Sequence, residues 1–142
     1  MSFEEKRTWI YLIVTALTYA GYVAIVLVRA QGVPIADVPY AGPMLGTIGV
    51  AIAASIVGTV VLSIRAPQEA HEKDERDRAI DRYGDVVGYF VSSVGVVVAL
   101  ALTMLEADHF WIGNAIYLAF VLAALISTTV KLVAYRRGFS PW

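Results

Sequence analysis

The chain alternates between long stretches without charge and short clusters of charged residues. No Asp, Glu, Lys or Arg occurs within residues 8–28, 38–64, 86–105 or 110–130. A helix needs about 20 mostly apolar residues to cross a hydrocarbon core of about 30 Å, and each stretch reaches that length. A water-soluble bundle would show polar faces at helical spacing, which these stretches lack. The pattern therefore predicts an all-α, integral membrane four-helix bundle of two transmembrane hairpins, forming a single domain.

The ends of the first two spans need separate arguments. Pro39 and Pro43 mark the start of the second span, which we set at about 40–64, because proline is tolerated in a first helical turn. At the end of the first span, Val28-Arg29-Ala30 loosely fits the cleavage site of a signal peptide. The uncharged stretch is longer than the core of about 7–15 residues in such a peptide. We therefore expect an uncleaved first span.

Positive charge is distributed unevenly between the connections. Of the 11 Lys and Arg residues, all but Arg29 precede the first span, lie between the second and third, or follow the fourth. Connections rich in Lys and Arg stay on the cytoplasmic side of a membrane. The sequence therefore predicts that both termini and the central charged segment are cytoplasmic. The outer connections, near 30–37 and 106–109, are short, so we expect no large extracellular partner.

The central segment, residues 68–85, is rich in both signs of charge. We expect a cytoplasmic helix that begins after Pro67 and continues into the third span as one rod. Asp77, Asp81 and Asp85 recur every fourth residue and so share one helical face. One interpretation is a face that docks a partner or a cation. The other, which we favour, is a solvated face, because the spacing does not fit a calcium-binding EF-hand loop.

Small residues also recur every fourth position in two spans. The series in the second span includes Ser55 and Thr59, and the series in the third span consists of Gly84, Gly88 and Ser92. Membrane helices approach closely where small residues line one face. We interpret both series as helix-packing surfaces, within one chain or between two copies. The alternative is a polar pore or ligand groove lined by the hydroxyl groups, although each hydroxyl can also bond within its own helix.

Two tyrosines, Tyr19 and Tyr22, lie deep in the first span. A buried tyrosine hydroxyl needs a hydrogen-bond partner. We expect both side chains to face other helices and to bond across the interface. The alternative is that they line a small-molecule pocket.

Composition excludes several kinds of chemistry. Apolar residues make up 58% of the chain and charged residues 16%, against about 45–50% and 25% in soluble domains. The absence of cysteine removes disulfides and thiolate metal sites, and the net charge of −1 suggests no nucleic-acid partner. His71 and His109 are expected on opposite sides of the membrane, so they cannot share a metal ion. With no nucleophile–base pair and no phosphate-binding glycine loop, we expect no enzyme activity, cofactor or metal.

A short motif in the central segment carries a resemblance. Asp74-Glu75-Arg76 followed by Ile80 is similar to the D-E-R-x-x-x-I signature of small bacterial membrane proteins of unknown function. The four-span layout and the ending Tyr135-Arg136-Arg137-Gly138 resemble uncharacterised proteins of actinobacteria. The resemblance implies the bacterial inner membrane and a regulatory or accessory role. It carries no catalytic or binding residue over to this chain.

These observations favour a non-enzymatic accessory, sensor or assembly protein of the bacterial inner membrane. Its contact surface would be the cytoplasmic charged helix, and its partners the lipid bilayer and a second copy or another membrane protein. The alternative is a small channel or carrier for ions or neutral solutes, lined by Ser, Thr and Tyr. Proton-coupled transport is disfavoured because no ionisable group lies near the centre of a span.

Overall fold

The computed structural model describes residues 2–67 and 74–138. They form α1 (Phe3–Arg29), a short 3-10 helix η1 (Ile35–Asp37), α2 (Ala41–Arg65), α3 (Glu75–Met104) and α4 (His109–Arg137). These two ranges contain no β-strand. All 4 α-helices are long and apolar enough to cross a membrane. The predicted all-α class with four helices of spanning length is confirmed.

α1 and α3 begin before their uncharged stretches because polar side chains cap them, whereas no side chain caps the start of α2 or α4. The Ser2 hydroxyl accepts a hydrogen bond from the Glu5 backbone N–H at 3.2 Å and starts α1. The Asp74 carboxylate accepts one from the Asp77 N–H at 2.7 Å and starts α3. From there α3 runs unbroken, so its charged part and the third span form one rod. The expectation that this rod starts after Pro67 is wrong, because Asp74 has extended backbone with ψ of 171° and α3 begins only at Glu75. Residues 68–73 of the segment predicted to be helical, His71 among them, lie outside the described residues.

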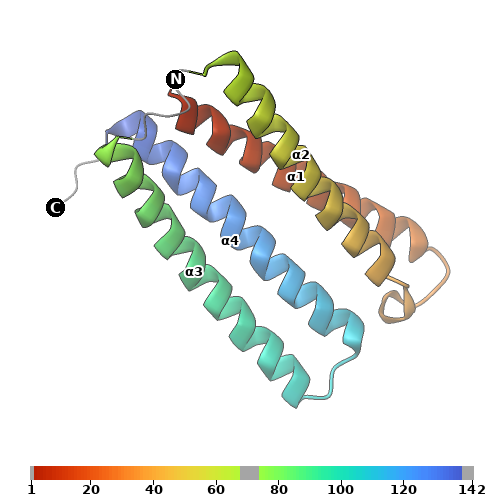
Figure 1. Ribbon diagram of the computed structural model, residues 1–142. Helices are drawn as coiled ribbons and strands as arrows, with labels where there is room; N and C mark the ends of the chain where they lie inside the picture. Colours follow the sequence, from red (N-terminus) through yellow and green to blue (C-terminus); the bar gives the residue numbers. More distant parts are fainter. Residues whose placement is uncertain (1, 68–73, 139–142) are drawn as a thin grey trace.

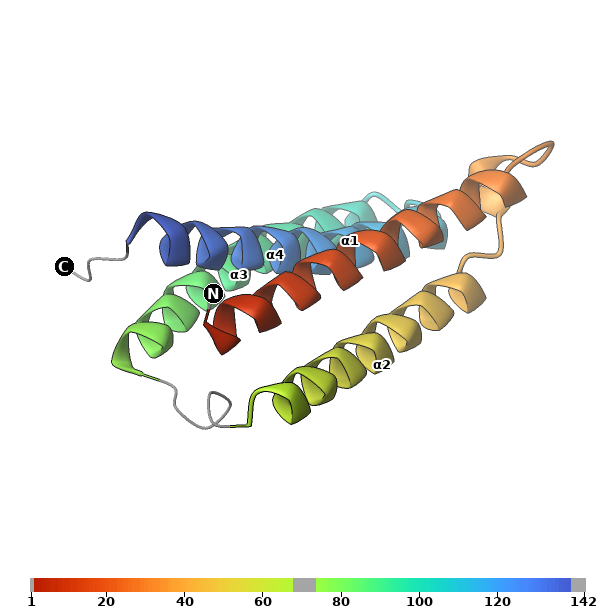
Figure 2. The same ribbon diagram turned by 90° about the horizontal axis from the view of Figure 1, so that it is seen from above.

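The four helices lie in an open layer. α1 packs against α2 and α4, and α3 packs extensively only against α4, which gives the order α2–α1–α4–α3. Figure 1 shows that α1 and α3 begin at the end where α2 and α4 finish, and we call this the charged end. Figure 2 shows α2 apart from α3, while α2 reaches α4 through the contact between Thr47 and Tyr117. The described residues therefore leave the outer sides of α2 and α3 uncovered.

The opposite end, which we call the loop end, contains a cluster of buried apolar residues. Its core consists of Tyr22, Val26, Val38, Phe110, Tyr117 and Val121. The Arg29 guanidinium donates to the Pro39 carbonyl at 3.0 Å and closes the connection before α2. Apolar contacts thus join α1 to α4 at the loop end.

The connection between α3 and α4 is a tight turn at Glu106. This residue has φ of 53°, a left-handed conformation that is costly for any residue but glycine. The Glu106 N–H bonds to the Thr103 carbonyl at 3.1 Å, and the Ala107 N–H bonds to the Leu102 carbonyl at 3.0 Å. This pair of bonds is the Schellman arrangement that ends many helices. It reverses the chain and sets α4 antiparallel to α3.

Candidate functional site: the charged end

Ion pairs concentrate at the charged end, where α1, α3 and α4 meet. The Lys131 ammonium of α4 lies 2.8 Å from a carboxylate oxygen of Asp85 and 3.3 Å from one of Asp81, both on α3. Only 14% of the Lys131 side chain is exposed. A charge covered to this degree requires paired anions. The two aspartates supply them at the level where the uncharged stretch of α4 ends.

Gly84 makes room for the Lys131 side chain. A Cβ atom added to this glycine would lie 2.5 Å from both Cγ and Cε of the lysine. That distance is far inside normal carbon–carbon contact, which is about 3.5–4.0 Å. The aliphatic stem of Lys131 therefore lies directly across Gly84 and brings the ammonium to the aspartates on either side of it in sequence.

The first turns of α1 join the same cluster. The Arg7 guanidinium lies 2.6 Å from the Glu4 carboxylate within α1 and 3.9 Å from the Asp81 carboxylate of α3. Glu4 is buried. Asp81 therefore faces one cation from α1 and another from α4. One carboxylate of α3 thus links three helices.

Tyr135 adds a buried hydroxyl beside this cluster. It lies beyond the uncharged stretch of α4, and its oxygen has no hydrogen bond of regular geometry among the described residues. Burial, followed by the negative charges of Asp77 and Asp81, raises the pKa of Tyr135 above its ordinary value. The hydroxyl therefore stays protonated, with the Asp77 carboxylate near enough to favour that form.

The acidic stripe of α3 faces the protein more than the solvent. Asp77 is 9% exposed, and the side chains of Asp81 and Asp85 are 17% and 52% exposed. The expectation of one solvent-exposed surface, whether solvated or docking, is therefore corrected for Asp77 and Asp81. The reason is helical register. Both residues share a face of α3 with Gly84, and that face packs against α4.

Sequence reasoning missed the role of Lys131, which it counted only among the Lys and Arg residues that follow the fourth span. Two signals pointed to it. Lys131 is the first charge after a long apolar stretch, and the acidic stripe of α3 continues directly into the glycine series. A cation on one helix can pair with acids on a second helix when glycines on that second helix allow the two to approach closely.

The two series of small residues have different surroundings. A Cβ atom added to Gly88 would lie 3.2 Å from the Ser127 Cβ, so Gly88 is in close contact with α4. Ser92, further along α3, is half-buried. On α2, Ser55 and Thr59 are also half-buried, and the Thr59 hydroxyl donates to the Ser55 carbonyl at 2.8 Å. The glycines therefore meet another helix, while this hydroxyl is satisfied within its own.

A cluster of tyrosines joins α1, α2 and α4 within the spans. The Tyr22 hydroxyl donates to the Asn114 side-chain oxygen at 2.6 Å, which confirms the bond predicted for Tyr22 but leaves the one predicted for Tyr19 unconfirmed. The hydroxyls of Thr47 and Tyr117 lie 3.2 Å apart. The Tyr19 ring packs edge-on against Tyr117, with centroids 5.4 Å apart. These contacts fill the space between the helices, which favours packing over a ligand pocket.

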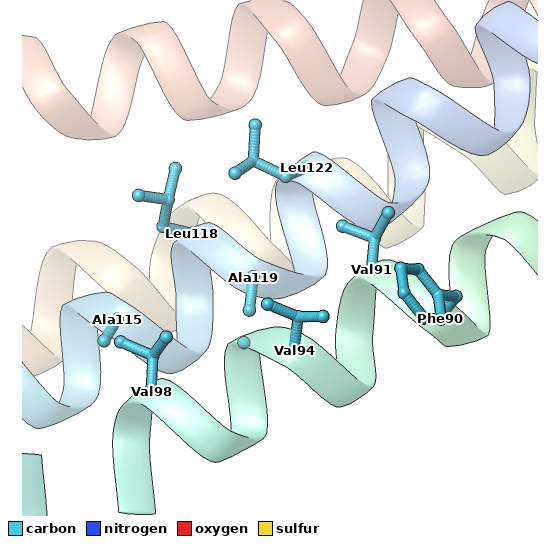
Figure 3. A pocket seen from close by; sticks show the side chains of 9 residues that line it. Phe90, Val91, Val94, Val98, Ala115, Leu118, Ala119 and Leu122 are labelled. Atoms are coloured by element: carbon cyan, nitrogen blue, oxygen red, sulfur yellow. The ribbon is translucent and has the colours of Figure 1, made fainter. Parts of the chain in front are cut away.

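An apolar groove of about 420 Å³ runs between α3 and α4 at the middle of their uncharged stretches. Figure 3 shows side chains from both helices along it. The residues that line it are Phe90, Val91, Val94, Gly95, Val98, Ala115, Leu118, Ala119 and Leu122. None of them has a polar side chain. The groove can therefore receive hydrocarbon but supplies no group for a reaction.

These features indicate a class of protein but do not indicate a particular reaction. The described residues contain no group of 3 or more His, Cys, Asp or Glu placed to hold a metal ion. What they contain is four apolar helices of spanning length and a three-helix ion-pair cluster at one end. These are the features of a multi-pass membrane protein. The chain matches no protein-family model, no curated protein and no solved structure.

Proposed function

We propose that the protein is a non-enzymatic assembly or accessory component of the bacterial inner membrane. In this proposal the outer face of α3 binds another membrane protein, and the charged end lies in the cytoplasm, as the distribution of Lys and Arg favours. The supporting observation is an exposed stripe on α3 that no other helix covers. It consists of Glu75, Arg78, Arg82, Val86, Tyr89, Ser93, Val96 and Leu100, and we call it the outer stripe.

The outer stripe changes in character along the helix. Its residues recur every three or four positions and therefore lie on one face. At the charged end it presents the guanidinium groups of Arg78 and Arg82, and within the uncharged stretch it presents Val86 and Tyr89, which is 71% exposed. A fitting partner has a transmembrane helix and an acidic segment at the membrane surface. Opposite charges across the contact would provide specificity more than affinity.

The ion-pair cluster supports this role indirectly. Lys131 and Asp81 fix the rotation of α3 about its axis relative to α4. With that rotation fixed, Asp77 and Asp81 point inward, while Arg78 and Arg82 point outward and Asp85 stays half exposed. The proposed contact surface on the charged helix therefore presents two arginines, in place of the acidic face considered from the sequence.

The channel or carrier alternative receives less support from the same helices. Several hydroxyls in the spans donate to carbonyl groups of their own helix at 2.7–2.9 Å, including those of Thr18, Thr59 and Ser63. A polar pathway needs groups that remain available to a solute. We therefore keep the assembly role as the proposal.

Cross-linking in cells tests the proposal. A photoreactive residue at position 86 should capture a specific membrane protein, and the charge reversals Arg78→Glu and Arg82→Glu together should abolish the capture. A matched control reverses two exposed arginines elsewhere at the charged end, Arg65→Glu and Arg137→Glu. The control should retain the cross-link. Equal capture in both double variants, or equal loss, would contradict a contact through the outer stripe.

A further inference from the structure

A second groove lies between α1 and α4 near the charged end, away from the outer stripe. It has a volume of about 340 Å³. The residues that line it are Trp9, Leu12, Thr129, Leu132, Val133, Arg136 and Arg137. We propose that this groove binds the headgroup and upper acyl chain of an anionic phospholipid. The inference rests on the membrane location and goes beyond the proposed partner contact.

The groove has the same order of polarity as a phospholipid. Along α4, its lining passes from Thr129 through Leu132 and Val133 to the two arginines, a length of about 12 Å at 1.5 Å per residue. Its apolar part lies beside the uncharged stretches, and its cationic part lies at the charged end. An acyl chain can therefore follow the leucine and valine side chains while the phosphate reaches the guanidinium groups.

The arginine at the mouth of the groove is positioned by an aromatic ring. The Arg136 guanidinium carbon lies 5.5 Å from the centroid of the Trp9 ring, within the range of a cation–π contact. The nearest carboxylate pair is loose, with the Glu5 oxygen 3.9 Å from Arg136 Nε, and 65% of the Arg136 side chain is exposed. The guanidinium therefore keeps donors available for a phosphate, which it can bind in bidentate geometry.

The charge of the lining distinguishes this groove from its neighbour on α3. This third groove, distinct from the apolar groove between α3 and α4, is lined by Arg78, Asp81, Arg82, Asp85, Val86 and Tyr89 of α3. It places two carboxylates beside its two arginines, so it suits a single phosphate group less well than a lining without carboxylates. The lining of the α1–α4 groove contains two arginines and no carboxylate. Basic pockets between membrane helices on the cytoplasmic side are suited to anionic headgroups.

Native mass spectrometry of the full chain in mild detergent tests the proposal. Phosphatidylglycerol should bind at least about tenfold more tightly than phosphatidylcholine with identical acyl chains, as expected for two basic contacts. The double variant Arg136→Gln and Arg137→Gln should lose this preference. The double variant Arg78→Gln and Arg82→Gln, with the same change in charge, should keep it. Partner capture at position 86 should show the opposite pattern, with loss in the Arg78 and Arg82 variant and retention in the Arg136 and Arg137 variant. Each proposal can therefore fail without the other.

Two further measurements test whether the groove binds the lipid itself and whether the loss in the variant reflects its charge. Inorganic phosphate at the lipid concentration should not displace phosphatidylglycerol, and full displacement would identify a free-phosphate site instead. If the glutamine variant loses helical content, the Arg136→Lys and Arg137→Lys variant replaces it and should retain the preference for the anionic lipid. Equal binding of both lipids to the wild type would overturn the proposal, as would equal losses in the two glutamine variants.

Discussion

The two hairpins use similar patterns of small residues but reach different degrees of contact. In the α3–α4 hairpin, a Cβ atom added to Gly95 would lie 2.0 Å from the Ala119 Cβ and 3.2 Å from its Cα. In the α1–α2 hairpin, the three atoms nearest to a Cβ added to Gly58 all belong to the Ile10 side chain, the closest at 2.8 Å. A Cβ atom at Gly49 would meet nothing within 4 Å. Small size alone therefore does not bring helices together.

The difference shows what joins helices in an apolar solvent. Lipid is as apolar as leucine, so association depends on close packing and on polar links between helices. The α3–α4 hairpin has both, with glycines against α4 and Lys131 paired with Asp81 and Asp85. α2 is linked to α4 through the Thr47–Tyr117 contact. We therefore expect α2 to separate from the layer more easily than α3.

The largest expected effect comes from filling the close contact of the α3–α4 hairpin. Gly95→Leu should lower the free energy of unfolding by about 3 kcal/mol, because overpacking forces the helices apart. Gly49→Leu in the open part of α2 should have no destabilising effect and gain up to about 1 kcal/mol from helix propensity. Unfolding by titration with a denaturing detergent, followed by circular dichroism, measures both. Similar values for the two variants would remove the distinction between the hairpins.

Removing the buried cation should have the next largest effect. Lys131→Met removes the ammonium that pairs with Asp81 and Asp85, although Arg7 still lies 3.9 Å from Asp81. It should cost about 2 kcal/mol, less than a fully buried pair because Asp85 is half exposed. Adding Asp81→Asn and Asp85→Asn should restore part of this loss. Arg137→Met, at the exposed end of α4, is the control. If Lys131→Met is no more destabilising than this control, the cluster does not join the helices.

The tyrosine cluster should contribute less. Tyr22→Phe removes the hydroxyl that bonds to Asn114 and should lower stability by about 0.6–1 kcal/mol, the usual value for a bond between membrane helices. Tyr11→Phe, at an exposed position of the same helix, should change stability very little. The same denaturing titration compares the two. A loss at Tyr11 as large as the loss at Tyr22 would contradict a specific bond.

The smallest expected effect is a gain at the α3–α4 turn. Glu106→Gly relieves a left-handed conformation and should raise stability by about 0.5–1 kcal/mol, with no change in any helix contact. Glu106→Ala is the control, since alanine keeps the unfavourable backbone and should bring no gain. Equal stability of the glycine and alanine variants would show that the turn is not strained.

The four long apolar helices could be predicted from the sequence because a single variable, the length of the uncharged stretches, decides them. Uncharged stretches of about 20 residues have few alternatives to a spanning helix, since backbone groups in lipid must bond within their own segment. The caps at Ser2 and Asp74 extend α1 and α3 beyond these stretches. Such caps depend on local side chains and are harder to predict from hydropathy.

The direction in which α3 faces could not be predicted from its charges alone. Asp77 and Asp81 fit a solvated face on an isolated helix, because nothing in a single helix tells which side meets a neighbour. The decisive information is the contact of Gly84 with Lys131, residues far apart in sequence. The arginines on the outer stripe became candidates for partner binding only after this rotation was fixed.

The central claim is that the chain crosses the membrane with its charged end inside the cell, and cysteine labelling tests it directly. The chain contains no cysteine, so single substitutions can be labelled without background. Gln31→Cys marks the loop end, and Arg78→Cys marks the charged end. In intact spheroplasts, a membrane-impermeant maleimide should label Gln31→Cys at once and Arg78→Cys only after lysis. Labelling of Arg78→Cys in intact spheroplasts would contradict the account.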